Sequence, residues 1–140
     1  MALFRRASQN DVPAIFHIDE RTSDQPERRL IITEAVLAGN CYIGLEVAAV
    51  LGYGILDHTF YGNGFIQLLF VAPRERRTGI GSALMAYMES ECRTEKLFAS
   101  TNVSNEPMHS LLARTGYVPS GMILNLDEGD PELVYFKRVR

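Results

Sequence analysis

An apolar segment, a basic turn with two glycines and a helical segment follow one another in residues 69–84, LFVAPRERRTGIGSAL. The first N–H groups of a helix have no partners within it, and the helix dipole adds partial positive charge at the same end. Gly79 and Gly81 allow a ligand to approach the backbone closely. Three arginines add positive charge to this turn: Arg74, Arg76 and Arg77. The segment therefore predicts an anion site suited to a phosphate or a pyrophosphate.

Two common phosphate-binding motifs do not fit this segment. A dinucleotide-binding fingerprint would need a third glycine where Leu84 stands, together with a βαβ context. A P-loop ends in Gly-Lys-Ser/Thr, whereas Gly81 is followed by Ser82 and Ala83. Taken alone, such a turn could equally be a solvated connection between a strand and a helix.

The apolar patterns of the whole chain predict the element order β-α-α-β-β-β-α-β-α-β-β, a mixed α/β architecture. Near the start, Ser8 and Asp11 resemble a capping box before a helix that carries Val12, Ile15 and Phe16 on one face. The polar run 21–29 is expected to be a loop. A short helix is expected over 33–38, with Thr33 as N-cap and Gly39 as its stop.

The rest of the chain predicts six strands and two helices. Strands are expected over 41–45, 51–60, 65–71, 97–101, 117–126 and 132–139. Helices are expected from 79 to about 95 and over 106–114, the second capped by Asn105. Residues 61–64, Tyr-Gly-Asn-Gly, indicate a hairpin turn. The turn near 46–49 is unusually apolar, and the pattern does not assign it a type.

Length and composition favour one soluble domain over residues 1–140. The net charge of −3 argues against a nucleic-acid partner, and no apolar run reaches the ~20 residues of a membrane helix. The polar N-terminus argues against a signal peptide, and two distant cysteines, Cys41 and Cys92, favour a reducing cytoplasm. Cys92 is expected to be a packing residue. No His or Cys spacing suggests a metal.

With its basic, glycine-containing turn between a strand and a helix, the chain resembles the GNAT superfamily of N-acetyltransferases. The spacing V-x-P-x-x-R-x-x-G-x-G of its acyl-CoA signature is met by Val71, Pro73, Arg76, Gly79 and Gly81. A second segment, N-x-x-A-x-x-L-Y-x-x-x-G-F, is matched in register by Asn105, Leu111, Gly116 and Tyr117. The opening FRRASQNDVPAI resembles the superfamily's first strand and helix. The resemblance implies a mixed, mostly antiparallel sheet of about seven strands with about four helices, splayed between strands 4 and 5.

The resemblance also implies an acetyl-CoA site. Backbone amides would hold the pyrophosphate of coenzyme A at Arg76, Arg77, Thr78, Gly79, Ile80, Gly81 and Ser82. The pantetheine arm would pair with the strand end formed by Leu69, Phe70 and Val71. A main-chain N–H of Leu69 or Phe70 would stabilise the oxyanion, and Asn105 would contact the cofactor.

The acid and base of the reaction are less clearly marked. Many family members have a glutamate on the strand before the pyrophosphate loop, where this chain has Gln67, which could orient a water. Asp57 or His58 is the nearest titratable alternative for the base, and each could equally be a surface residue. Leu112 stands where the superfamily often has a tyrosine acid. His109, Ser110 or a water could replace that acid, although His109 could equally be only an exposed helix residue.

The expected activity is acetyl transfer from acetyl-CoA to a primary amine of a small molecule or a peptide, by direct attack. The alternative is a non-catalytic acyl-CoA-binding or sensing module of the same fold. The acidic turn 127–132 could attract a cationic amine or be a solvated hairpin turn. Tyr53, Phe60 and Tyr61 could line an acceptor pocket or pack within the sheet. A homodimer is possible.

Overall fold

The computed structural model describes residues 1–140, and its element order is the one that the sequence predicts. The strands are β1 (Leu3–Arg6), β2 (Cys41–Glu46), β3 (Ala49–Phe60), β4 (Asn63–Val71), β5 (Lys96–Asn102), β6 (Val118–Ile123) and β7 (Glu132–Arg138). The α-helices are α1 (Val12–Ile18), α2 (Pro26–Ala38), α3 (Ile80–Glu91) and α4 (Glu106–Arg114). Three short 3-10 turns are η1 (Gln9–Asp11), η2 (Glu20–Ser23) and η3 (Pro73–Glu75).

The strands form one sheet in the order β1-β2-β3-β4-β5-β7-β6. The pairs β1–β2, β2–β3, β5–β7 and β6–β7 are antiparallel, whereas β4 and β5 are parallel. This confirms the expected mixed, mostly antiparallel sheet. The parallel ladder joins only residues 64–66 to 97–99, although β4 continues to Val71 and β5 to Asn102. A short ladder is what the expected splay between these two strands requires.

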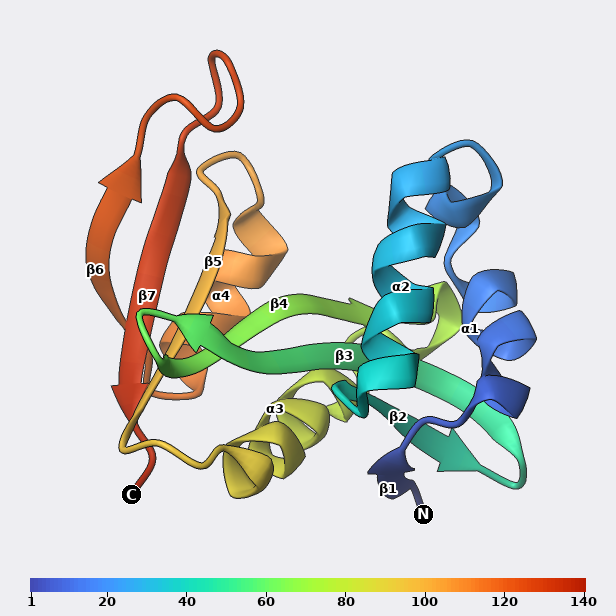
Figure 1. Cartoon of the computed structure of the whole chain (residues 1–140). Coiled ribbons are helices and arrows are strands. Elements are labelled where there is room, and N and C mark those ends of the chain that lie inside the picture. Colours follow the sequence, from blue (N-terminus) through green and yellow to red (C-terminus); the bar gives the residue numbers. More distant parts are fainter. The chain divides into compact units, whose positions relative to one another are not determined.

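The chain divides into two compact units. The first contains Met1–Leu56 and Leu68–Met88. In it, α1 and α2 pack on one face of the sheet around Ile15, Ile32 and Tyr53, all fully buried (Figure 1). On the opposite face α3 approaches closely, because Gly54 has no side chain: the sulfur of Met88 lies 2.6 Å from where a Cβ would stand. This packing holds the start of α3 at the end of β4.

The second unit contains Asp57–Gln67 and Glu89–Arg140. Here β5, β7 and β6 lie side by side, with α4 packed behind them (Figure 1). Glu89 accepts hydrogen bonds from the Tyr117 hydroxyl at 2.9 Å and from Lys137 Nζ at 3.1 Å. Tyr117 is 3% exposed, and burial raises the pKa of its hydroxyl. The cluster ties the end of α3 to β7 and to the start of β6. Cys92 is fully buried, which confirms its packing role.

The expectation for residues 21–38 is partly wrong. Helix α2 begins at Pro26, so the second half of the predicted loop is helical, and η2 occupies part of the first half. Proline has no N–H to lose and a suitable φ at the first position of a helix, so Pro26 starts the helix. Thr33 is therefore no N-cap: it lies within the helix, and its hydroxyl donates to Arg29 O at 2.8 Å. The predicted stop at Gly39 is confirmed by its φ of 77°.

Smaller differences concern element ends. Helix α3 ends at Glu91 rather than near 95, and β6 ends at Ile123 rather than at 126.

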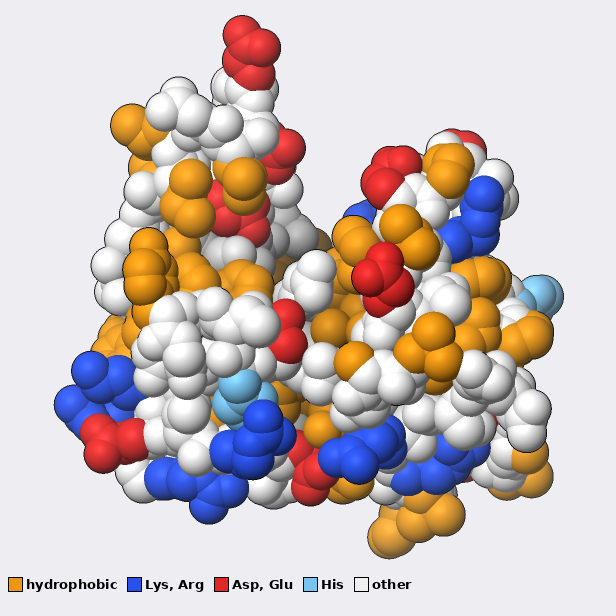
Figure 2. Space-filling model, viewed as in Figure 1, with side chains coloured by type: hydrophobic (Ala, Val, Ile, Leu, Met, Phe, Trp, Pro, Cys, Tyr) orange, Lys and Arg blue, Asp and Glu red, His pale blue; other side chains and the backbone are white.

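Every residue of β6 is exposed, and apolar side chains gather over β6 and its connection to β7 on the face seen in Figure 2. Because β6 is an edge strand, its outer backbone groups and these side chains are open to a partner. None of the helices combines the length and the hydropathy that crossing a bilayer needs.

The apolar turn between β2 and β3 has a strained backbone. Val47 and Ala48 have φ values of 48° and 66°, the left-handed region that a two-residue hairpin of this type requires at both positions. A β-branched residue rarely adopts this region, because its Cβ is crowded there. Val47 is 97% exposed, so no packing compensates. The hairpin therefore forms in spite of its turn residues, held by the pairing of β2 with β3.

Replacing this turn with Val47→Asn and Ala48→Gly is expected to stabilise the protein. Asn-Gly is the preferred pair for this turn, and relief of the left-handed strain is worth about 1–2 kcal/mol. Urea unfolding should show a higher midpoint with an unchanged slope. Val47→Ala is the matched control, since it leaves a strained non-glycine residue in place. A double variant no more stable than that control would contradict this account of the turn.

The predicted capping box at the start of α1 is confirmed and reinforced by an arginine. The Ser8 N–H donates to Asp11 Oδ2 at 2.7 Å, although the box caps η1, which leads into α1. Arg5 donates to both carboxylate oxygens of Asp11, at 2.7 and 3.0 Å. Hydrogen bonding to Arg5 lowers the pKa of Asp11 from its ordinary 3.8 to about 2. The ionised carboxylate thus joins β1 to the first helix.

A depressed folded-state pKa makes this contact acid-sensitive. Its stabilisation is fully present above the unfolded pKa of 3.8 and is lost as the pH falls through about 2. Asp11→Asn should lower the free energy of unfolding at pH 6 by about 1 kcal/mol, a figure discounted because the Arg5 side chain is 47% exposed. The difference from the unmodified protein should shrink between pH 4 and pH 2 in denaturant titrations. A constant difference would count against the ion pair, and Asp24→Asn, at an exposed site, serves as control.

Candidate functional site

The turn between β4 and α3 lies in the first unit. Strand β4 ends at Val71, η3 follows, and α3 begins at Ile80. Two residues of the turn have left-handed backbones, Arg77 with a φ of 69° and Gly79 with a φ of 87°. A Cβ on Gly79 would meet nothing within 4 Å. Gly79 is therefore required by its backbone conformation, and the space beside it is open.

The backbone N–H groups of this turn are free to bind a ligand. From Arg76 to Ser82 no backbone N–H forms a well-aligned hydrogen bond with another group of the chain. The first that does belongs to Ala83, which donates to Gly79 O at 3.0 Å. Seven consecutive donors at a helix N-terminus, beside open space, could hold an anion, and we call this segment the cradle. These residues fit the diphosphate that the sequence predicts here.

The side chain of Arg76 does not extend into this cradle. Its Nε donates to Val71 O at 3.2 Å, and its guanidinium carbon lies 5.3 Å from the centre of the Phe70 ring. Thr78 is also engaged locally, since its hydroxyl donates to Glu75 O. An anion in this turn would therefore meet backbone groups, whereas the Arg76 side chain lies against the neighbouring strand end.

Phe70, near the end of β4, is the centre of a cluster of cations. Its ring is 5% exposed and stacks on Tyr53 at 5.9 Å between centroids. Three guanidinium groups lie within 6.0 Å of the ring centroid, those of Arg21, Arg28 and Arg76. We call this set of three arginines around Phe70 the Phe70 cation cluster. Cations are attracted to the face of an aromatic ring, and a protein uses such sites to hold them in place.

A buried carboxylate supports this cluster. Asp19 is completely buried, and its Oδ2 accepts from the Tyr53 hydroxyl at 2.5 Å and from Arg28 Nε at 2.7 Å. Burial and the hydrogen bond to Asp19 raise the pKa of Tyr53, so its hydroxyl stays protonated. No motif in the sequence singles out Asp19, Arg21 and Arg28. The only signal was a polar run after an apolar helix, which is equally typical of a loop.

The base candidates lie in the second unit and are engaged there. Asp57 Oδ1 accepts from the Thr59 N–H at 3.2 Å and from its hydroxyl at 2.9 Å. His58 Nε2 accepts from the Arg93 N–H at 3.0 Å, and burial lowers the pKa of the imidazole. Gln67 is exposed. The contacts of Asp57 and His58 favour structural roles, whereas Gln67 keeps its amide open to water.

The second predicted segment is also held by its own contacts. Asn105 caps α4 by accepting from the Met108 N–H at 3.3 Å, and its amide donates to Thr101 Oγ1 at 3.0 Å. His109 Nε2 lies 3.0 Å from the carbonyls of residues 102 and 103, so this nitrogen carries the proton. In the neutral ring Nδ1 then accepts from the Tyr135 hydroxyl at 2.7 Å. These contacts favour a positioning role for His109. Leu112 is fully buried.

The acidic turn between β6 and β7 is largely occupied by hydrogen bonds. Asp127 accepts from Asn102 at 2.8 Å, and Asp130 accepts from the N–H and the hydroxyl of Ser104. Glu132 accepts from Ser100 at 2.8 Å. The turn thus secures the connection after β5. The contacts therefore support the structural interpretation of this turn.

The aromatic candidates for an acceptor pocket have separate surroundings. Tyr53 is fully buried, and Phe60 packs against Phe65 and Phe98 with 5.0 Å between ring centroids. Tyr61, at the tip of the hairpin, is 90% exposed. These positions favour packing within the sheet for Phe60. No cluster of three or more His, Cys, Asp or Glu side chains able to hold a metal ion is present.

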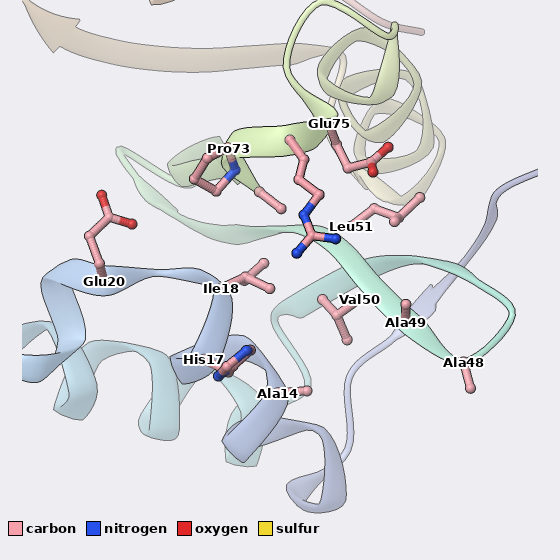
Figure 3. A pocket seen from close by; sticks show the side chains of 12 residues that line it. Ala14, His17, Ile18, Glu20, Ala48, Ala49, Val50, Leu51, Pro73 and Glu75 are labelled. Atoms are coloured by element: carbon pink, nitrogen blue, oxygen red, sulfur yellow. The ribbon is translucent and has the colours of Figure 1, made fainter.

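One open pocket of about 650 Å³ lies in the first unit, apart from the cradle (Figure 3). Its walls come from the end of α1 with Ile18, from the start of β3 with Val50 and Leu51, and from η3 with Pro73. His17, Glu20 and Glu75 stand around its rim (Figure 3). None of the residues from 76 to 82 lines it. The pocket is thus a second hollow next to η3, with a mostly apolar lining.

Comparison with known proteins gives one family and many related structures. The model of the acetyltransferase (GNAT) family matches residues 4–117. A comparison with curated proteins gives no match. A GNAT-family acetyltransferase from Bacillus cereus is 37% identical, with a TM-score of 0.91 over 99% of this chain and 97% of that one.

Two more distant structures share the fold. The ribosomal-protein-S18-alanine N-acetyltransferase of Escherichia coli is 16% identical, with a TM-score of 0.80 over 99% of this chain and 94% of that one. A streptothricin acetyltransferase candidate from Bacillus anthracis, in complex with acetyl coenzyme A, is 18% identical. Its TM-score is 0.64 over 70% of this chain and 61% of that one. At these identities the likeness concerns the fold alone.

Proposed function

Because this chain belongs to the acetyltransferase (GNAT) family, we propose that it is an N-acetyltransferase that moves an acetyl group from acetyl-CoA to a primary amine. The observation that carries the proposal is the cradle of free N–H groups from Arg76 to Ser82. A diphosphate bound there would satisfy donors that nothing in the chain satisfies. The fold shared with a structure that contains acetyl coenzyme A is consistent with this ligand.

The residues that would hold acetyl-CoA are mainly backbone groups. The N–H groups of Arg76, Arg77, Thr78, Gly79, Ile80, Gly81 and Ser82 would bind the pyrophosphate. The end of β4, Leu69 to Val71, would pair with the pantetheine arm like an additional strand. The side-chain amide of Asn105 already forms hydrogen bonds with Thr101 and with the Met108 N–H. Asn105 would therefore fix the start of α4 and would not bind the cofactor through this amide.

The chemistry that acetyl-CoA would supply is an activated thioester. The N–H of Leu69 or Phe70 would donate to the thioester oxygen as it gains negative charge, which lowers the barrier to attack by the amine. A C–N bond forms, the C–S bond breaks, and the amine loses one proton. A thiolate with a pKa near 8.5 can leave without a dedicated acid. With Asp57 and His58 engaged, we favour a water oriented by Gln67 as the route for the proton.

The finer assignments belong to the same proposal. We propose one domain over residues 1–140, acting in the cytoplasm, where free thiols such as Cys41 and Cys92 persist. The acceptor would be a small molecule or a peptide, with neither nucleic acid nor membrane as partner. Association of two copies stays a prediction, for which the exposed edge strand β6 offers a surface.

A panel of amines tests the proposed activity. With acetyl-CoA and the right amine, the protein should release free coenzyme A thiol, which a thiol-reactive dye measures. The panel should include amino acids, polyamines, aminoglycosides and peptides with free N-termini. Acetyl-CoA should also raise the melting temperature, because a ligand that binds only the folded state stabilises it. Stabilisation without thiol release from any amine would instead support the non-catalytic acyl-CoA-binding module.

Gly81→Glu is expected to prevent binding at the cradle. The new side chain would bring bulk and negative charge into the first turn of α3, where the diphosphate would lie, and acetyl-CoA affinity should fall at least a hundredfold. Ala86→Glu makes the same change of charge at an exposed position of α3 and should bind normally. Isothermal titration with coenzyme A measures both, and circular dichroism checks folding. Unchanged affinity in Gly81→Glu would refute the proposed cradle.

A further inference from the structure

We propose that the acceptor amine carries a carboxylate or a similar anionic group, and that the Phe70 cation cluster binds it. The proposal rests on the N-acetyltransferase function and names its substrate class. It assigns Arg21, Arg28 and Arg76 as the residues that recognise the acceptor. The ligand chemistry is an amino acid or another short amine with a negative charge.

The charge balance of the cluster is the first observation. Three guanidinium groups lie within 6.0 Å of the Phe70 ring centroid. Only Arg28 has a carboxylate partner, the buried Asp19. Arg21 and Arg76 form no ion pair, so the cluster carries an excess of positive charge. Like charges gathered around one ring repel one another, and a bound anion would offset that repulsion.

The second observation is how each arginine is held. Arg28 is fixed by Asp19, which is itself completely buried and bonded to Tyr53. Arg76 is tied by its Nε to the Val71 carbonyl. Arg21 is held through its backbone, since its N–H donates to Asp19 Oδ1 at 3.2 Å and its carbonyl accepts from the Gln25 N–H at 3.0 Å. Its guanidinium group donates to no acceptor of the chain, and the residue is exposed. Two guanidinium groups are thus preorganised, and the third reaches solvent with its planar donors free for a carboxylate.

The position of the cluster in the fold is the third observation. Phe70 is one of the two residues whose N–H is proposed to face the thioester oxygen. If the anionic group of the acceptor is held beside this ring, the amine of the same molecule, a few bonds away from that group, would lie close to the end of β4. Cationic polyamines would be repelled by the same three charges. The site therefore favours short amines with a carboxylate over those with further positive charge.

Another source of the anion is a phosphate of coenzyme A, because Arg76 belongs to the turn that would hold its diphosphate. The two sources predict different effects of Arg21→Gln, which removes the charge of an exposed residue and keeps most of its length. Loss of acceptor recognition changes KM for the amine. Loss of a phosphate contact changes KM for acetyl-CoA.

The experiment compares matched pairs of acceptors, each natural α-amino acid and β-alanine beside its amide, by release of coenzyme A thiol. We expect at least one acid to have a KM at least tenfold lower than its amide. In Arg21→Gln the KM for that acid should rise about tenfold, with the amide and acetyl-CoA unaffected. Arg114→Gln, an exposed arginine of α4, is the control and should match the unmodified protein.

A binding measurement separates this inference from the proposed activity. Isothermal titration of every acid and its amide without acetyl-CoA should show that at least one acid binds and its amide does not, and that Arg21→Gln loses this binding. That result would support the anion site even if no amine releases thiol. The absence of thiol release would overturn only the proposed acetyltransferase function. Equal KM values for every acid and its amide would overturn the inference. So would an Arg21→Gln variant in which only the KM for acetyl-CoA changes.

Discussion

The first N–H groups of a helix have no partner within the helix, and the proposed activity depends on this constraint. Here the N–H groups without a well-formed hydrogen bond extend over seven residues, from Arg76 to Ser82, because the turn before α3 contributes donors as well. Such a cradle needs a rigid support. The absence of a side chain at Gly54 lets Met88 approach β3, and that contact fixes α3 against the sheet. The free N–H groups are therefore held in a fixed position, where a ligand can reach them.

A second constraint acts on the other face of the same sheet. Asp19 is buried, so its charge must be compensated within the protein, and Tyr53 and Arg28 supply the hydrogen bonds. These bonds join the η2 turn, the strand β3 and the start of α2. They also bring Arg28 beside Phe70, near the end of the strand that leads to the cradle. The two constraints meet at β4, where backbone groups are proposed to bind acetyl-CoA and arginines surround the Phe70 ring.

Much of this could be predicted from the sequence. The element order and the stop at Gly39 both follow from local signals, because glycines and apolar periodicity act over a few residues. The errors have the same origin. Pro26 can end a loop or start a helix, and only the burial of the apolar face of α2 decides between them. The apolar turn at Val47 could not be assigned, since the pairing of two strands imposes its conformation against local preference.

By itself the sequence determined the mixed α/β class, the family and the segment proposed as the anion cradle, because each depends on residues that are close together in the chain. Only the tertiary structure decided which side chains share one place. Asp19, Arg28 and Tyr53 are up to 34 residues apart, and nothing in their spacing predicts a common network. Nor does the motif indicate that Arg76 turns toward Phe70. Such contacts arise when hydrophobic burial packs distant elements together, and no local pattern records them.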